Sequence, residues 1–162
     1  MYLQELQLKN FRNYDSLKIK LNPHINIIYG NNAQGKTNLL ESIYVLGLTK
    51  SHLLALDNSL IKNGEKFCNI KGTVRKNSIK TKYEISYNLD NKILKIDNQE
   101  IKKVTEYINN SLNIIIFYPE NLEIIKGSPN NRRNFLNLEL SQLSDNYLKI
   151  ITEYNKLLKI RN

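Results

Sequence analysis

Residues 30–37 have the spacing of a loop that binds phosphate groups. Their sequence, GNNAQGKT, matches G-x-x-x-x-G-K-[ST] at every fixed position. The glycines of such a motif allow backbone angles that turn successive amide N–H groups toward phosphate oxygens, at the positive end of a helix. Lys36 would reach the β- and γ-phosphates, and the hydroxyl group of Thr37 would bind a magnesium ion. The motif therefore predicts binding of a nucleoside triphosphate, and we expect ATP with Mg²⁺.

We assign nine consecutive residues to this nucleotide site. Thr37 is also the expected magnesium ligand, and no residue is assigned a catalytic role. The nine residues are Gly30, Asn31, Asn32, Ala33, Gln34, Gly35, Lys36, Thr37 and Asn38.

A phosphate loop of this kind lies between a strand and a helix, and the sequence predicts both. Residues 25–29, INIIY, form a short apolar segment that predicts a strand leading into the loop. Apolar residues then recur with helical spacing, which predicts a helix from about residue 36 to about residue 46. The amino end of that helix would hold the phosphates.

Alternating apolar and polar residues predict further strands on both sides of the loop. Leu6 and Leu8, and then Leu17, Ile19 and Leu21, predict a hairpin whose turn lies at residues 13–16. Three more strands, separated by hairpin turns, are predicted at residues 67–74, 80–89 and 92–96.

The C-terminal part of the sequence changes to helical patterning. A short helix is predicted at residues 102–109, followed by a buried strand at 112–117. Pro129 suits the first turn of a helix, and the last predicted helix carries an apolar stripe from Tyr147 to Leu158.

These elements predict an α/β fold in two parts. The first is a lobe at residues 1–127 with a mixed sheet around the loop helix. The second is the start of a helical lobe at residues 128–162.

Length and composition predict an ordinary globular domain. A chain of 162 residues can bury a core that folds without disulfides or metals. The single cysteine, Cys68, excludes an internal disulfide and is expected to be a small buried residue. The N-terminus lacks the pattern of a secretory signal, and no apolar run approaches the roughly 20 residues that span a bilayer. We therefore expect a cytoplasmic protein with no membrane partner.

The formal net charge of +9 predicts an acidic partner, and nucleic acid is the usual one. An A/T-rich coding sequence would also enrich lysine, so the distribution of charge carries more weight than its total. Residues 62–82 hold seven Lys and Arg against one Glu. Such a cluster can be the solvated edge of a hairpin or a surface that follows DNA phosphates. Under the second interpretation the expected DNA contacts are Lys71, Arg75 and Lys76.

The residues alone leave three classes of function open. A small-molecule kinase usually carries the loop on its first strand, whereas two β-type segments precede it here. A β-rich interaction module would leave the loop without a role. An ATPase of the ABC type fits the order of segments, but neither its acidic strand nor its Leu-Ser-Gly-Gly-like signature is found, so we expect negligible ATP turnover by these 162 residues alone. GTP is not expected, because the Asn-Lys-x-Asp motif is missing its acid in NKIL at 91–94.

Several short strings occur in the order found in one protein family. They are NFRNY at 10–14, GKTNLLE at 35–41 followed by Ile43 and Tyr44, KSH at 50–52, FYPE at 117–120, KGSP at 126–129 with Arg132 and Arg133, and finally Tyr154, Leu158, Arg161 and Asn162. Through these strings the whole chain resembles the RecF family of recombinational DNA-repair ATPases.

The resemblance implies an ABC/SMC-like head, of which this chain is the first lobe and the start of the second. It implies that two heads sandwich ATP, so that ATP drives homodimerisation on DNA at single-strand gaps or junctions and hydrolysis releases it. It also implies RecR and RecO as partners, the loading of RecA, and roles in replication and the SOS response.

Five residues differ from those usual in the family. Ala33 replaces a glycine and would be strained if its φ angle is positive. Leu53 replaces an arginine, which removes any guanidinium contact at that position. The remaining three are Asn121, Asn137 and Ile160, in place of Asp, Asp and Gln.

Overall fold

The computed structural model describes residues 1–53, 57–117 and 126–161. They form two compact units, Met1–Leu112 and Asn113–Asn162, and each unit is described by itself. The predicted lobe boundary after residue 127 concerns a complete head and stays a prediction. None of the helices in the described ranges is long and apolar enough to cross a membrane.

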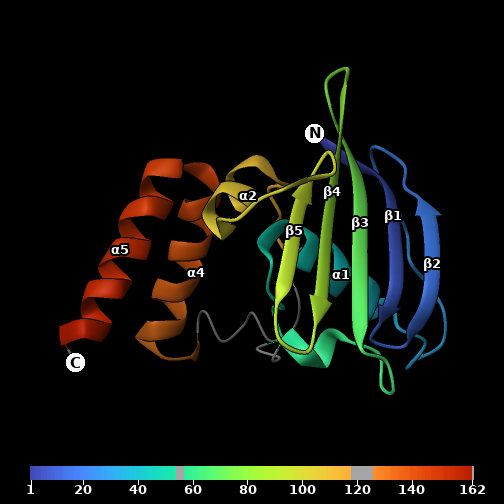
Figure 1. The fold of residues 1–162 in the computed structure, drawn as a ribbon, viewed down its shortest axis with the longest axis horizontal. Coiled ribbons are helices and arrows are strands. Elements are labelled where there is room, and N and C mark those ends of the chain that lie inside the picture. The colour runs from blue at the N-terminus through green and yellow to red at the C-terminus, as the bar shows by residue number, and fades with distance from the viewer. Residues whose placement is uncertain (54–56, 118–125, 162) are drawn as a thin grey trace. The chain divides into compact units, whose positions relative to one another are not determined.

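The first unit is built on a six-stranded sheet in the order β2-β1-β3-β4-β5-β6 (Figure 1). We expected a mixed sheet, but every neighbouring pair among the described strands is antiparallel. Four of these five pairs join consecutive strands through turns that are too short for a parallel crossover. The fifth pair, β1 with β3, forms after the longer segment that contains α1. The strands are β1 (Tyr2–Phe11), β2 (Tyr14–Lys20), β3 (Phe67–Lys76), β4 (Ile79–Asn88), β5 (Lys92–Ile96) and β6 (Gln99–Glu100).

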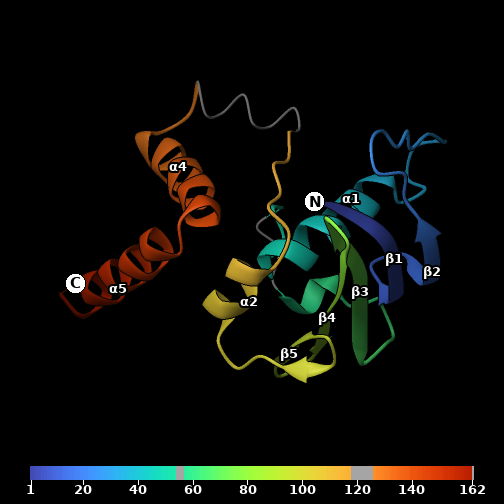
Figure 2. The same ribbon diagram turned by 90° about the horizontal axis from the view of Figure 1, so that it is seen from above.

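Helix α1 (Lys36–Leu48) lies against one face of this sheet (Figures 1 and 2). It begins where the sequence predicts and continues two residues beyond the predicted end. Its inner side is fully buried at Val45 and Leu46. The alternating residues that the strands turn toward α1 complete the core; those with no exposed area are Leu6, Ile70, Ile85 and Cys68.

The carbonyl groups at the end of α1 are bonded by side chains from the rest of the unit. Tyr107 in helix α2 (Val104–Asn110) donates its hydroxyl to the carbonyl of Leu46 at 3.0 Å, and Ser111 donates to that of Gly47 at 2.7 Å. Tyr87 donates to the carbonyl of Thr49 at 2.9 Å. Because the last carbonyls of a helix have no partner within the helix, these bonds fix its C-terminal end.

The second unit contains helix α4 (Pro129–Leu143) and helix α5 (Asp145–Arg161), which pack against each other. Pro129 lies in the first turn of α4, as predicted. Of the predicted apolar stripe on α5, Leu148 is buried, whereas Tyr154 and Leu157 are more than half exposed. The structure also contains a short 3₁₀ helix, η1 (Asp57–Leu60), in the first unit.

Two predicted strands do not form. Residues 25–29 are irregular, and Ile27 and Tyr29 are 82% and 90% exposed. The predicted strand at 112–117 is likewise irregular, with Phe117 83% exposed. Both predictions rested on apolar runs, but a strand also needs a neighbour that accepts its backbone hydrogen bonds. No described strand pairs with either segment.

A phosphate-binding loop and a basic hairpin

The backbone of residues 30–35 curls through a series of positive φ angles. Gly30 has φ 149°, Ala33 has φ 63° and Gly35 has φ 95°. Gly30 and Gly35 reach these angles without the steric cost that a side chain would add, whereas Ala33 carries that cost. Because the φ angle of Ala33 is positive, alanine is strained at this position, where the family commonly has glycine. The curl brings the chain directly into the first turn of α1.

The amino end of α1 is open to an anion. Gly35 occupies the N-cap position, no side chain caps the helix there, and no residue of the first turn is acidic. The first N–H groups of a helix have no partner within it, and the helix dipole makes this end positive. An uncapped end that follows a curled glycine-containing loop is the arrangement that binds phosphate.

Lys36 lies folded over the loop. Its ammonium group donates to the carbonyl oxygens of Gly30 at 2.8 Å and Asn31 at 2.5 Å. The side chain therefore already lies along the curl, where it could exchange these carbonyls for phosphate oxygens. Thr37 is exposed at the same end of the helix. The structure thus brings together the predicted lysine, the predicted metal ligand and the open helix end.

The β1–β2 turn closes one side of the loop, a contact that the sequence does not predict. Asn38 donates its side-chain amide to Oδ1 of Asn13 at 2.9 Å, and the Tyr14 hydroxyl donates to the carbonyl of Gly35 at 3.1 Å. Burial raises the pKa of Tyr14, which keeps its hydroxyl group protonated as a donor. Asn13 and Tyr14 belong to the string NFRNY, one of the short strings that carry the family resemblance. That string does not show that its residues contact others more than 20 positions away in the chain.

The basic cluster of residues 62–82 divides into two environments. Lys71 lies on the face of the sheet opposite α1, where its ammonium group is 3.3 Å from the carboxylate of Glu84. Lys62 forms an ion pair with Asp15. By contrast, Arg75 and Lys76 lie at the far end of β3, where Arg75 is directly opposite Lys80.

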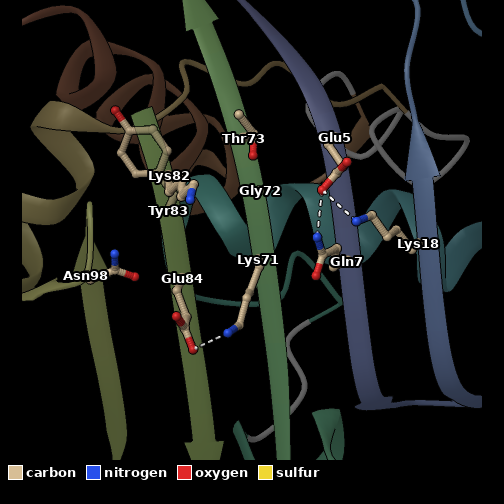
Figure 3. A pocket seen from close by; sticks show the side chains of 10 residues that line it. All are labelled: Glu5, Gln7, Lys18, Lys71, Gly72, Thr73, Lys82, Tyr83, Glu84 and Asn98. Carbon is tan, nitrogen blue, oxygen red and sulfur yellow. Dashed lines mark hydrogen bonds and ion pairs between the residues drawn. The ribbon is translucent and has the colours of Figure 1, made fainter. Parts of the chain in front are cut away.

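A polar hollow of about 370 Å³ lies on the open face of the sheet, with Lys71 in its lining. Figure 3 shows the Lys71–Glu84 pair beside a second one, in which Lys18 is 3.6 Å from Glu5. Gln7 also donates to Glu5 at 2.6 Å, and this bond, with a smaller effect from Lys18, lowers the pKa of that carboxyl group. The two carboxylates of the hollow, Glu5 and Glu84, are thus each matched by a lysine, and Lys82 lies in the same lining.

The comparisons with known proteins identify the family. A family model described as the RecF/RecN/SMC N terminal domain matches residues 2–122, which is about three quarters of the chain. The chain belongs to this family. The match confirms the resemblance inferred from the short strings and the α/β class inferred from the predicted elements.

RecF proteins are similar to the chain over its whole length. The DNA replication and repair protein RecF of Latilactobacillus sakei subsp. sakei (strain 23K) is 45% identical over 162 residues, and that of Bacillus cereus (strain G9842) is 42% identical. The chain covers 43% of the length of each of these curated relatives. The activity and partners of a whole RecF protein are therefore proposals for this chain.

Solved RecF structures have the same fold. The recombination mediator protein RecF-ATP in the RecFOR pathway superposes with a TM-score of 0.92 and 36% sequence identity. The match covers 99% of this chain and 43% of that one. A second structure, of RecF-ATPrS in the same pathway, gives a TM-score of 0.91. The ABC/SMC-like head expected from the RecF resemblance is confirmed as the fold class.

Residues 118–120 of the string FYPE, together with Asn121 and Asn162, lie outside the described residues. Arg132 and Arg133 lie on α4, where Arg133 is exposed.

Proposed function

We propose that this chain is the ATP-binding N-terminal part of a RecF-like DNA-repair protein. The observation that carries the proposal is the curled loop at the uncapped end of α1, with the Lys36 ammonium group folded into the curl. The similarity to the solved structure of RecF-ATP supports the choice of nucleotide. The observed geometry also argues against a β-rich module in which the loop has no role.

The residues of the loop divide the work of holding ATP. Backbone N–H groups of residues 31–37 would surround the phosphates, and Lys36 would leave the carbonyls of Gly30 and Asn31 to contact the β- and γ-phosphates. The exposed hydroxyl group of Thr37 would bind Mg²⁺, which neutralises phosphate charge when it is bound. No residue in the described ranges is assigned as the catalytic acid. We therefore propose that ATP hydrolysis requires further parts of a RecF-like protein.

The proposal is tested by titrating the full chain with a fluorescent ATP analogue in the presence of Mg²⁺. Replacing Lys36 by alanine should abolish measurable binding, because the phosphate charge then loses its main side-chain partner. Lys102→Ala is the matched control, since Lys102 is exposed and lies outside the loop. Equal affinities for wild type and Lys36→Ala would show that the loop is not the nucleotide site.

We further propose DNA as the macromolecular ligand, with the tip of the β3–β4 hairpin as one contact. Arg75 and Lys80 are directly opposite each other, and Lys82 follows on the same face of β4. Like charges in opposite positions destabilise a sheet, and DNA phosphates would relieve that repulsion. The predicted contacts at Arg75 and Lys76 are thus retained and extended to Lys80 and Lys82. The DNA contact predicted at Lys71 stays a prediction, and the charge of Lys71 is already matched by Glu84.

The wider role follows from the resemblance to RecF proteins. We propose a cytoplasmic protein that dimerises with ATP on gapped or junction DNA, works with RecR and RecO, and helps load RecA during replication and the SOS response. The solved RecF structures are described as a recombination mediator protein in the RecFOR pathway, which supports this role. A small-molecule kinase is the weaker alternative, because the relatives are named for DNA replication and repair.

A further inference from the structure

Arg12 and Glu41 form a two-pronged ion pair within the first unit. The guanidinium group of Arg12 donates through Nε to Oε2 of Glu41 at 2.9 Å and through its terminal nitrogen to Oε1 at 2.6 Å. The Glu41 side chain is completely buried, and that of Arg12 is 21% exposed. Glu41 lies four residues after Thr37, one turn into α1. The pair therefore joins the β1–β2 turn to the helix that follows the phosphate loop.

Two further segments bind to the same pair. Arg12 also donates to the backbone carbonyl of Ser59 at 2.7 Å, and the Ser51 hydroxyl donates to Oε1 of Glu41 at 2.5 Å. Charges buried in this way cost free energy unless their hydrogen bonds are satisfied. An apolar contact could join the turn to the helix without that cost, but it would not fix their relative orientation. A forked pair with several bonds fixes it.

The turn that Arg12 holds has an unfavourable backbone conformation. Arg12 has φ 52°, an angle that residues other than glycine, asparagine and aspartate rarely adopt. The turn then presents Asn13 to the loop, where its amide nitrogen would lie 2.6 Å from a Cβ atom placed on Gly35. Together with the Tyr14 bond to the carbonyl of Gly35, this contact confines the last glycine of the loop. The ion pair thus supports the turn, and the turn supports the loop.

We propose that Arg12 and Glu41 are positioning residues for the phosphate loop. Their ion pair holds the β1–β2 turn so that Asn13 and Tyr14 keep Gly35 in its left-handed conformation, with the N–H groups of the loop directed at the phosphates. The proposal rests on the nucleotide site proposed above. It explains why the strings at 10–14, 35–41 and 50–52 occur together, since each contributes a residue to one network.

The test is the affinity for the ATP analogue, measured beside thermal unfolding in the full chain. Arg12→Lys keeps the charge but loses the fork, and Glu41→Gln keeps the shape but loses the charge. Each should weaken ATP binding about tenfold, the effect of losing one charge-assisted hydrogen bond. Glu5→Gln, which removes the ion pair with Lys18 on the open face, is the matched control and should leave the affinity unchanged.

Asn13→Ala separates positioning from stability. It truncates an amide in a turn, so the protein should remain folded with the same thermal midpoint while ATP binding weakens. Combined with Arg12→Lys, it should add little further loss, because both variants interrupt the same chain of contacts. Unchanged affinity in Asn13→Ala, or simple additivity in the double variant, would overturn the proposal while Lys36→Ala still abolishes binding. If Lys36→Ala binds normally, the nucleotide site itself is wrong.

Discussion

Leu46 of helix α1 packs directly over Gly72 of strand β3. A Cβ atom on Gly72 would lie 2.2 Å from Cδ2 of Leu46 and 2.9 Å from Cδ1 of Leu3, distances that atoms in contact do not adopt. The missing side chain therefore sets how closely α1 approaches the sheet. Because the phosphate loop leads into α1 and its neighbouring turn belongs to the sheet, this one packing contact also affects how the loop meets Asn13.

Gly72→Ala should destabilise the protein by about 1–3 kcal/mol, the usual cost of extra volume in a packed core. The change in the free energy of unfolding is measured from the shift of the urea midpoint, provided that the slope of free energy against urea concentration is unchanged. Thr73→Ala, on the opposite face of the same strand, is the control and should shift stability by no more than about 0.5 kcal/mol. Equal midpoints for the two variants would show that α1 can move away from the sheet at no cost.

Ala33→Gly should stabilise the protein, although most alanine-to-glycine changes do the reverse. Ala33 has φ 63°, an angle that costs a residue with a side chain about 1–2 kcal/mol. The greater freedom of glycine in the unfolded chain offsets about 0.4–1 kcal/mol of that gain. The net gain should be about 0.8 kcal/mol in urea unfolding, the difference between the middles of these two ranges. Asn77→Gly in the β3–β4 turn is the comparison. It should stabilise the protein less than Ala33→Gly, because asparagine tolerates a φ of 55° better than alanine would.

Local patterns were sufficient to predict most of the elements. Strand β5 has the predicted bounds, and β3, β4 and α1 end within two residues of prediction. One buried face and a nearby turn define a hairpin strand, and both are visible in a short stretch of sequence. The strand predictions for residues 25–29 and 112–117 were wrong because they lacked this second kind of information. The apolar composition of both segments is clear in the sequence, but strand pairing depends on a distant segment.

The same limit applies to the candidate site. The motif alone identified Lys36 and Thr37, because its chemistry fixes their spacing. It gave no indication that Asn13 would contact the loop or that Arg12 would pair with Glu41, since those residues are 29 positions apart. The sequence presents the lysine cluster as one surface, whereas the register places Arg75 opposite Lys80 and leaves Lys71 paired with Glu84.

Cys68 should resist thiol reagents in the folded protein. Burial raises the pKa of its thiol from the ordinary 9.0 to about 12, so at pH 8 little reactive thiolate exists. Alkylation by iodoacetamide should therefore proceed only through unfolding and accelerate with urea. The same shift makes stability fall as pH rises from about 9 toward 12, because the thiol of the unfolded chain ionises first. Cys68→Ala should show a shallower fall over this range; an identical fall would exclude Cys68 as a contributor.

Removing charge at the β3–β4 tip should weaken DNA binding without changing sequence preference. Replacing Arg75, Lys76 and Lys80 by glutamine removes three possible phosphate contacts, and each lost contact lowers the slope of log K against log salt by about 0.9. The measurement is fluorescence anisotropy on gapped DNA at several salt concentrations.

Lys102→Gln with Lys103→Gln is the control for loss of charge outside the tip, because both lysines are exposed and lie outside β3 and β4; it removes two charges and is compared with the double variant Arg75→Gln with Lys80→Gln. Lys71→Gln should have a smaller effect than any single tip variant, since the Lys71 charge is already matched by Glu84 at 3.3 Å. If the triple variant has the same salt slope as wild type, the charges at the tip do not contact DNA. They would then only keep the hairpin end solvated and discourage its pairing with other sheets. A loss confined to one DNA sequence would instead indicate contacts with bases.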